Sequence, residues 1–257
     1  MMKIFTFIFL ILSSFELLSQ IPDISTRWEA VTIDRNWDQY RMEELDNEEY
    51  FQYDFSSIIS NQIRLKGDPW STYIGVFGPK NRRIDFHLTA SKSSKKTYNV
   101  IGKSRLGKNI RDLKGEITLK YAVKTGWEAN VMIFEYKLQE PGDKEGDGKF
   151  VGLGSLAFLI RDGKPKMFWA ESGDFREFNN IFVGTWDRFN SDVSRECMFA
   201  FNPSGTHMKL PFRDYLYKEF EEGDECKCYF EFKDELKQYG WEEYDDSDNY
   251  KTNWWEK

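Results

Sequence analysis

The sequence contains few of the residues that most often build catalytic and metal centres. Among its 257 residues there are only two histidines, His87 and His207, so a zinc site with three histidine ligands is excluded. No H-E-x-x-H or G-x-S-x-G string occurs either. The three cysteines, Cys197, Cys226 and Cys228, come late in the chain, so none can begin an exported chain as a lipid-modified cysteine. The sequence therefore favours no enzymatic activity.

Long hydrophobic runs are also missing. The apolar stretch Ile4–Leu12 has about nine residues, roughly half of the ~20 that a helix needs to cross a bilayer. Lys3 precedes it and a more polar stretch follows it, which predicts a secretory signal peptide over residues 1–20. We therefore expect an exported protein, whether periplasmic, on the cell surface or secreted, with no membrane span after signal removal.

Aromatic residues, in contrast, are abundant at 17% of the chain, and they suit the pleated surface of a sheet. From Thr72 onward, short alternating segments are separated by polar turns that contain glycine, and the alternation is clearest from Leu113 to Val123. The pattern predicts a mostly β fold, an antiparallel meander barrel or strongly curved sheet with one or two short helices.

Four segments follow from these patterns: a signal peptide (1–20), an N-terminal flanking segment (21–71), a β-barrel-like core (72–202) and a C-terminal extension (203–257). In the flanking segment, Trp28, Val31 and Ile33 fit an edge strand.

The C-terminal extension has three parts of different pattern. The apolar spacing from Phe212 to Phe220 predicts a short amphipathic helix, and Glu225–Lys233 alternates like a strand. The tail from Glu242 is acidic and aromatic, and we expect it to be loosely ordered or docked through its tryptophans.

The charge is distributed unevenly along the chain. Residues 21–50 carry 9 acidic and 3 basic side chains and residues 211–257 carry 15 and 7, so the net charge of −7 conceals a basic middle. Three explanations stay open: a solvated basic face, acidic segments packed across that face, or an anionic partner such as a surface polymer. Nucleic acid is not expected as a partner.

The three cysteines predict one disulfide, because an exported protein meets an oxidising compartment. Cys226 and Cys228 are two residues apart in a predicted strand, so a bond between them would strain the backbone. We therefore expect Cys197 to pair with Cys226 or Cys228, and the sequence does not choose between them.

Two short segments match ligand-binding motifs but lack the other features that those motifs need. Gly152–Ala157 matches the dinucleotide pattern G-x-G-x-x-A, but the turn Asp162-Gly163 follows where a helix is needed. We interpret these glycines as strand residues and expect no cofactor and no metal. The loop Gln139–Gly148 is acidic and predicts a solvated hairpin loop.

A cluster of carboxylates supports an alternative function. Glu171, Asp174 and Glu177 lie between two predicted strands, where a carboxylate pair is able to act on a glycosidic bond. The alternative to binding is therefore an exported carbohydrate-active enzyme or other hydrolase.

The string Gly184-Thr185-Trp186 is the strongest local pattern. It is similar to the G-x-W strands of lipocalin-like and avidin-like barrels, and with the meander of short strands it makes residues 72–202 resemble small exported bacterial barrels of this kind. The resemblance implies that Trp186 closes one barrel end and that Gly184 admits close packing. It also implies binding of a small ligand, a surface ligand or a partner protein.

Overall fold

The computed structural model describes residues 23–30, 43–60, 72–125, 129–168, 180–201, 217–221, 228–232, 234–241 and 254–256. The predicted signal peptide lies outside these residues.

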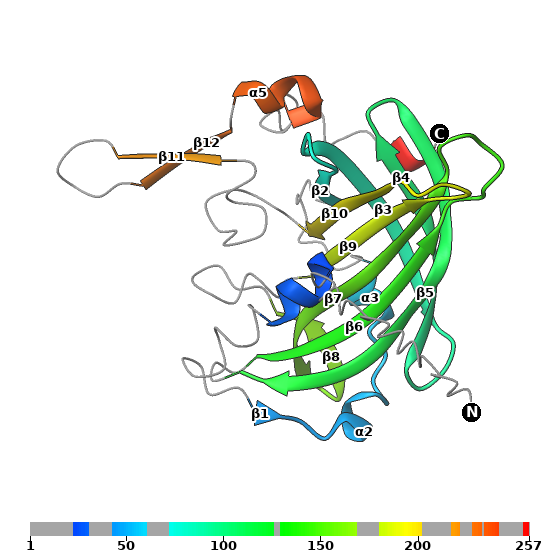
Figure 1. The fold of residues 1–257 in the computed structure, drawn as a ribbon. Coiled ribbons are helices and arrows are strands. Elements are labelled where there is room, and N and C mark those ends of the chain that lie inside the picture. The colour runs from blue at the N-terminus through cyan, green and yellow to red at the C-terminus, as the bar shows by residue number, and fades with distance from the viewer. Residues whose placement is uncertain are drawn as a thin grey trace, which may run out of the picture.

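Eight antiparallel strands form a closed ring (Figure 1). Each strand pairs with its neighbours in chain order, and the ring closes because the last strand, β10, pairs with the first, β2. Two short strands are attached to it: β1 (Glu43–Glu44) pairs with β5, and β8 (Lys164–Met167) pairs with β7. The predicted mostly β fold with a strongly curved antiparallel sheet is confirmed. The ring strands are β2 (Tyr73–Phe77), β3 (Arg82–Lys92), β4 (Thr97–Leu106), β5 (Asn109–Lys124), β6 (Asn130–Gln139), β7 (Gly148–Arg161), β9 (Ile181–Arg188) and β10 (Ser194–Phe201).

Glycines that face the interior allow the sheet to curve so tightly. Gly152 of β7 lies directly opposite Gly184 of β9. A Cβ atom added at Gly184 would lie 2.0 Å from the carbonyl oxygen of Val151 and 2.8 Å from the Cα of Gly152. Neither backbone atom is able to move away cheaply, so only glycine fits here. Residues 152–157 lie within β7, as their interpretation as strand residues requires.

Aromatic side chains fill the interior of the ring. Phe199 stacks between Phe86, with ring centroids 3.9 Å apart, and Phe182, with centroids 4.5 Å apart. Tyr73 and Phe134 pack edge-on against Phe182 from two other strands. All five side chains are almost completely buried. The centre of the ring is therefore a packed core and not an open channel.

Residues 47–60, the plug segment, close one end of the ring. They contain the short helices α2 (Asn47–Tyr50) and α3 (Ser56–Ile59), and the side chains of Phe51 and Phe55 are buried in the interior core. Lys92 at the end of β3 donates hydrogen bonds from its ammonium group to the carbonyls of Phe51, Gln52 and Tyr53. These bonds anchor the plug segment to the sheet.

The outer face of the ring carries a second apolar layer. Over β2, β10, β9, β7 and β6 it is buried beneath the helical residues 24–30, through Ile24 and Trp28, and beneath Leu236 and Trp241. Leu236 belongs to α5 (Asp234–Leu236) and Trp241 to η3 (Lys237–Trp241). The predicted edge strand at Trp28 is therefore wrong, because this residue covers the sheet from a helix. Val31 and Ile33 lie outside the described residues.

The C-terminal extension differs in part from the prediction. Residues 217–221 form strand β11 (Tyr217–Glu221), so the predicted helix from Phe212 to Phe220 is wrong in its second half; the first half lies outside the described residues. β11 pairs with β12 (Cys228–Phe232) in a separate two-stranded sheet (Figure 1). An alternating pattern fits a strand that has a single neighbour as well as it fits a strand of the core. In residues 217–221, the pairing of β11 with β12 therefore overrides the helical spacing of the apolar residues.

The last described residues are docked on the ring through tryptophans. In η6 (Trp254–Glu256), Trp255 stacks on His87 of β3 with ring centroids 4.5 Å apart. The guanidinium of Arg105 lies 5.0 Å from the ring centroid of Trp254, which is buried. His87 points outward as expected, but it is covered by this stacked ring.

Replacing Gly184 with alanine tests the close strand approach. We expect Gly184→Ala to lower the free energy of unfolding by about 3 kcal/mol or more, because the added methyl collides with backbone atoms. Thr185→Ala is the matched control, since the next side chain is partly exposed on the opposite face and its loss should cost less than about 0.5 kcal/mol. Urea unfolding measures both, and equal stability of the two variants would contradict the tight approach.

Candidate functional site

The end of the ring opposite the plug segment contains a cavity of about 230 Å³. The turns at residues 78–81, 107–108 and 189–193 and the loop 140–147 surround this end, at the top of Figure 1. We call it the mouth cavity. Its lining is Phe77, Arg82, Ile84, Ser104, Leu106, Asn109, Arg111, Glu140, Gly146, Phe150 and Trp186.

Strand alternation explains why these side chains meet. Ile84 follows the inward phase of Phe86 in β3, and Trp186 follows that of Phe182 in β9. Ile84, Phe150 and Trp186 are buried and form an apolar floor, whereas Arg82 and Asn109 are exposed at the rim. The mouth cavity therefore has an apolar floor and a polar entrance, and the buried polar side chains of Ser104 and Glu140 lie in its wall.

Glu140 and Trp186 form a buried polar pair in this cavity. The Glu140 carboxylate accepts hydrogen bonds at one oxygen from the indole Nε1 of Trp186 (3.1 Å) and from the backbone N–H of Gly148 (2.6 Å). A Cβ atom at residue 148 would lie 2.6 Å from the Trp186 indole, so the glycine is needed to admit the ring. The Trp186 ring also packs against Phe77, with centroids 5.5 Å apart.

Burial raises the pKa of Glu140 above its ordinary value, because the charged form is poorly solvated there. The hydrogen bonds from Trp186 and Gly148 and the positive charge of Arg111 oppose this rise without cancelling it. Within the described residues, Glu140 is the one buried carboxylate that forms no ion pair. Its two hydrogen-bond donors are both neutral.

Asp147 shapes the loop beside the cavity. Its carboxylate accepts the backbone N–H groups of Gly142 (3.0 Å) and Lys144 (3.2 Å) and pairs with Arg111 at 2.8 Å. Burial acts to raise the pKa of Asp147, but these donors outweigh it and hold the pKa below its ordinary value. Asp147 thus fixes both the loop and the guanidinium of Arg111.

Two polar groups of the mouth cavity are unsatisfied within the described part of the chain. The side chain of Ser104 is buried, with 3% of the residue exposed, yet no described residue hydrogen-bonds its hydroxyl. Arg82 at the rim likewise forms no hydrogen bond or ion pair with any described residue. Both groups are therefore able to hydrogen-bond a ligand with polar groups in the cavity.

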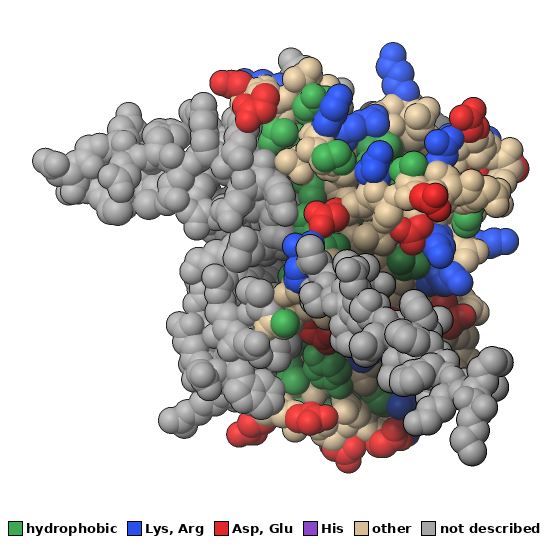
Figure 2. Space-filling view, in the orientation of Figure 1, with side chains coloured by type: hydrophobic (Ala, Val, Ile, Leu, Met, Phe, Trp, Pro, Cys, Tyr) green, Lys and Arg blue, Asp and Glu red, His purple; other side chains and the backbone are tan. Residues whose placement is uncertain are grey.

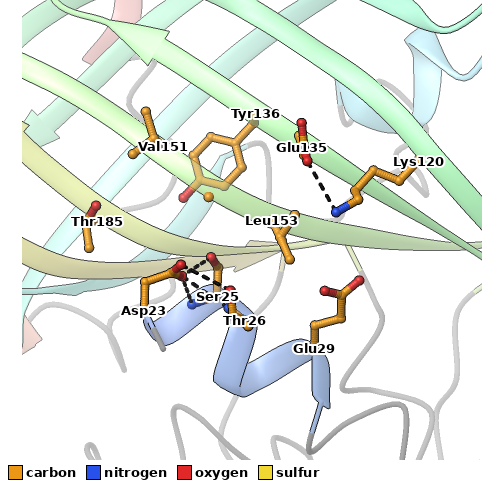
Figure 3. A pocket seen from close by; sticks show the side chains of 11 residues that line it. Asp23, Ser25, Thr26, Glu29, Lys120, Glu135, Tyr136, Val151, Leu153 and Thr185 are labelled. Atoms are coloured by element: carbon orange, nitrogen blue, oxygen red, sulfur yellow. Dashed lines mark hydrogen bonds and ion pairs between the residues drawn. The ribbon is translucent and has the colours of Figure 1, made fainter. Parts of the chain in front are cut away.

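A second hollow lies on the outer face of the ring, between strands β6, β7 and β9 and the helical residues 24–30 (Figure 3). We call it the groove. It is more open and measures about 440 Å³. Its lining includes Asp23, Glu29, Glu135, Lys120 and Thr185.

The carboxylates of the groove already have partners within the protein. Asp23 caps the helix by accepting from the backbone N–H of Ser25 (2.8 Å), and Glu29 accepts the hydroxyl of Tyr121 (2.7 Å). Glu135 pairs with Lys120 at 3.2 Å (Figure 3). These groups hold the helix and the sheet together, so the groove is the weaker candidate for a binding site.

The structure corrects the predicted disulfide. Cys197 is a free thiol that is fully buried in the interior core, among the aromatic side chains. Burial raises its pKa far above the ordinary value. Cys197 faces the inside of the closed ring, and Cys228 belongs to strand β12, which pairs with β11 in a separate sheet and not with β10. Cys226 lies outside the described residues.

The remaining predicted site residues fall in two groups. Trp186 lies at the mouth of the ring and Gly184 at a close approach of β7 and β9. Glu171, Asp174 and Glu177, the candidates for hydrolysis, lie outside the described residues.

No protein-family model, curated protein or solved structure matches this chain. The resemblance to lipocalin-like and avidin-like barrels therefore stays a prediction, and the site has to be interpreted from its own chemistry.

Sequence analysis missed Glu140, Asp147 and Arg111. The loop Gln139–Gly148 was expected to be solvated, and Asp143 and Glu145 are indeed exposed, but Glu140 and Asp147 are buried. The inward phase of Tyr136 and Leu138 continues to position 140, so the alternation of β6 was the signal that predicts an inward Glu140.

Two further properties of the described residues concern metals and membranes. In the described ranges, no group of three or more His, Cys, Asp or Glu side chains is arranged to hold a metal ion. The helices found in those ranges are all too short or too polar to cross a membrane.

The raised pKa of Glu140 predicts a pH-dependent stability difference. The folded protein binds this proton more tightly than the unfolded chain, so the contribution of Glu140 to stability falls as the pH rises through its raised pKa. Glu140→Gln keeps an oxygen that accepts from Gly148 and Trp186 but cannot ionise. In urea unfolding, we expect the variant to gain stability relative to the wild type as the pH is raised from acidic values through the raised pKa of Glu140. A difference that stays constant with pH would contradict the assignment.

The buried thiol of Cys197 predicts slow alkylation. In the folded protein, iodoacetamide should leave Cys197 unmodified, because the thiol is buried and its raised pKa disfavours the reactive thiolate. In denaturant without reductant, the same residue should react fully, as peptide mapping by mass spectrometry would show. If Cys197 became reactive only after reduction, it would be disulfide-bonded and the structural assignment would be wrong.

Proposed function

We propose that this chain is an exported binding protein whose mouth cavity holds a small amphipathic molecule. The observation that carries the proposal is that aromatic side chains fill the ring except at its mouth, where a cavity has an apolar floor and a polar rim. A concave apolar site with a few convergent polar groups is the usual form of a small-molecule site.

The dimensions of the mouth cavity limit the ligand. Its volume of about 230 Å³ lies below the range of about 300–1,000 Å³ that is typical for drug-sized ligands. Behind it, Phe86 and Phe199 are stacked at 3.9 Å and leave no passage into the ring. The ligand is therefore about the size of a single six-membered ring with one polar substituent.

The polar groups of the cavity set the orientation of the ligand. Ile84 and Phe150 at the floor offer only apolar contacts, so the apolar end of the ligand enters first. The hydroxyl of Ser104 offers a hydrogen bond part of the way in, and the polar end stays near Arg82 and Asn109.

Export is part of the proposal and rests on the N-terminal sequence. Lys3, the short apolar stretch Ile4–Leu12 and the polar residues after it form the pattern of a cleaved signal. A protein that binds a small molecule outside the cell or in the periplasm needs no catalytic group, which agrees with the scarcity of catalytic motifs.

Ligand-observed NMR with benzyl alcohol and cyclohexanol as probes tests the proposed site. We expect saturation transfer to at least one probe with the wild type and its loss in Ser104→Leu, because the larger side chain fills the mouth cavity. The matched control is Thr185→Leu, which narrows the groove on the outer face instead and should leave binding unchanged. Both variants must unfold cooperatively in urea, as the wild type does.

Two outcomes would overturn the proposal. Loss of binding in Thr185→Leu with retention in Ser104→Leu would move the site to the groove. Absence of transfer to both probes would mean that the mouth cavity does not accept ligands of the predicted kind.

A further inference from the structure

We infer that the polar end of the ligand is an acidic group of the carboxylate type, held at the rim of the mouth cavity by Arg82. This inference rests on the proposed function and names the class of ligand, small amphipathic organic acids.

Three charged side chains line the mouth cavity, Arg82, Arg111 and Glu140, and they differ in their partners. Arg111 is paired with Asp147 at 2.8 Å, so its charge is already neutralised. Glu140 has its hydrogen bonds from neutral donors, Trp186 and Gly148, and lies among the buried residues. Arg82 is exposed and has no carboxylate partner among the described residues, so it is the cation that remains available to an incoming anion.

The backbone on both sides of Arg82 is held in place. On one side, the carbonyl of Asn81 accepts a 2.7 Å hydrogen bond from the indole of Trp241. On the other, Arg83 pairs with the buried carboxylate of Asp85 at 2.9 Å. Since its neighbours are fixed to the outer face of the ring, Arg82 presents its side chain from a rigid position, which lowers the entropic cost of binding.

The matched probes benzoate and benzamide separate charge from shape, because they differ little except in the charge of the head group. We expect the wild type to bind benzoate more tightly than benzamide in titrations followed by NMR at low salt. Arg82→Gln should weaken benzoate binding about three- to tenfold and leave benzamide binding unchanged, as loss of one partly exposed charge-assisted hydrogen bond implies. Lys108→Gln is the control, since it removes an exposed cation from a neighbouring turn that does not line the cavity. This control is needed because Lys and Arg side chains lie among Asp and Glu side chains on the described surface seen in Figure 2.

The outcomes distinguish this inference from the proposed function. If both probes bind equally, are blocked by Ser104→Leu and ignore Arg82→Gln, the mouth cavity is a binding site but the acidic ligand is wrong. If Arg82→Gln and Lys108→Gln weakened benzoate binding equally, the effect would come from general surface charge. That result would also overturn the inference. If neither probe binds the wild type, both the inference and the proposed function fail.

Discussion

The pairing of β10 with β2 is the constraint on which the rest of the structure depends. It joins the last ring strand to the first, so each of the eight ring strands has two neighbours and the ring itself has no edge strand. Eight strands can close only if the sheet curves tightly, and this requires glycine where strands approach closely, as at Gly152 and Gly184. The small interior that results has room for stacked aromatic rings and for little else.

A filled interior confines binding to the ends and the outside of the ring. One end is closed by Phe51 and Phe55 of the plug segment, which Lys92 ties to the sheet. The outer face carries its own apolar layer, covered by residues 24–30 and by Trp241. The mouth differs from both, because there polar side chains such as Ser104 and Glu140 join the aromatic ones and a cavity remains between them.

The buried carboxylates among the described residues are stabilised in two different ways. Asp85 is paired with Arg83 and Arg105, and Asp147 with Arg111, so each charge is compensated by an opposite one at 2.6 to 2.9 Å. The Glu140 carboxylate instead accepts hydrogen bonds from neutral donors, and burial raises its pKa. A carboxylate held without a cation is costly for stability, and such costs are typical of positions that serve binding or chemistry.

Alternation of apolar residues was sufficient to predict the mostly β fold, because a strand places alternate side chains on one face whatever its partners are. The phase of β6 extends to Glu140, but alternation could not predict that Asp147 is buried, since an acidic loop has the same composition in solvent and against a cavity. The thiol of Cys197 was assigned a disulfide partner from its compartment, yet closure of the ring turned it inward, away from the separate β11–β12 sheet. The local sequence pattern thus determined the strands. The closing of the ring decided which side chains are buried and which remain able to bind a ligand.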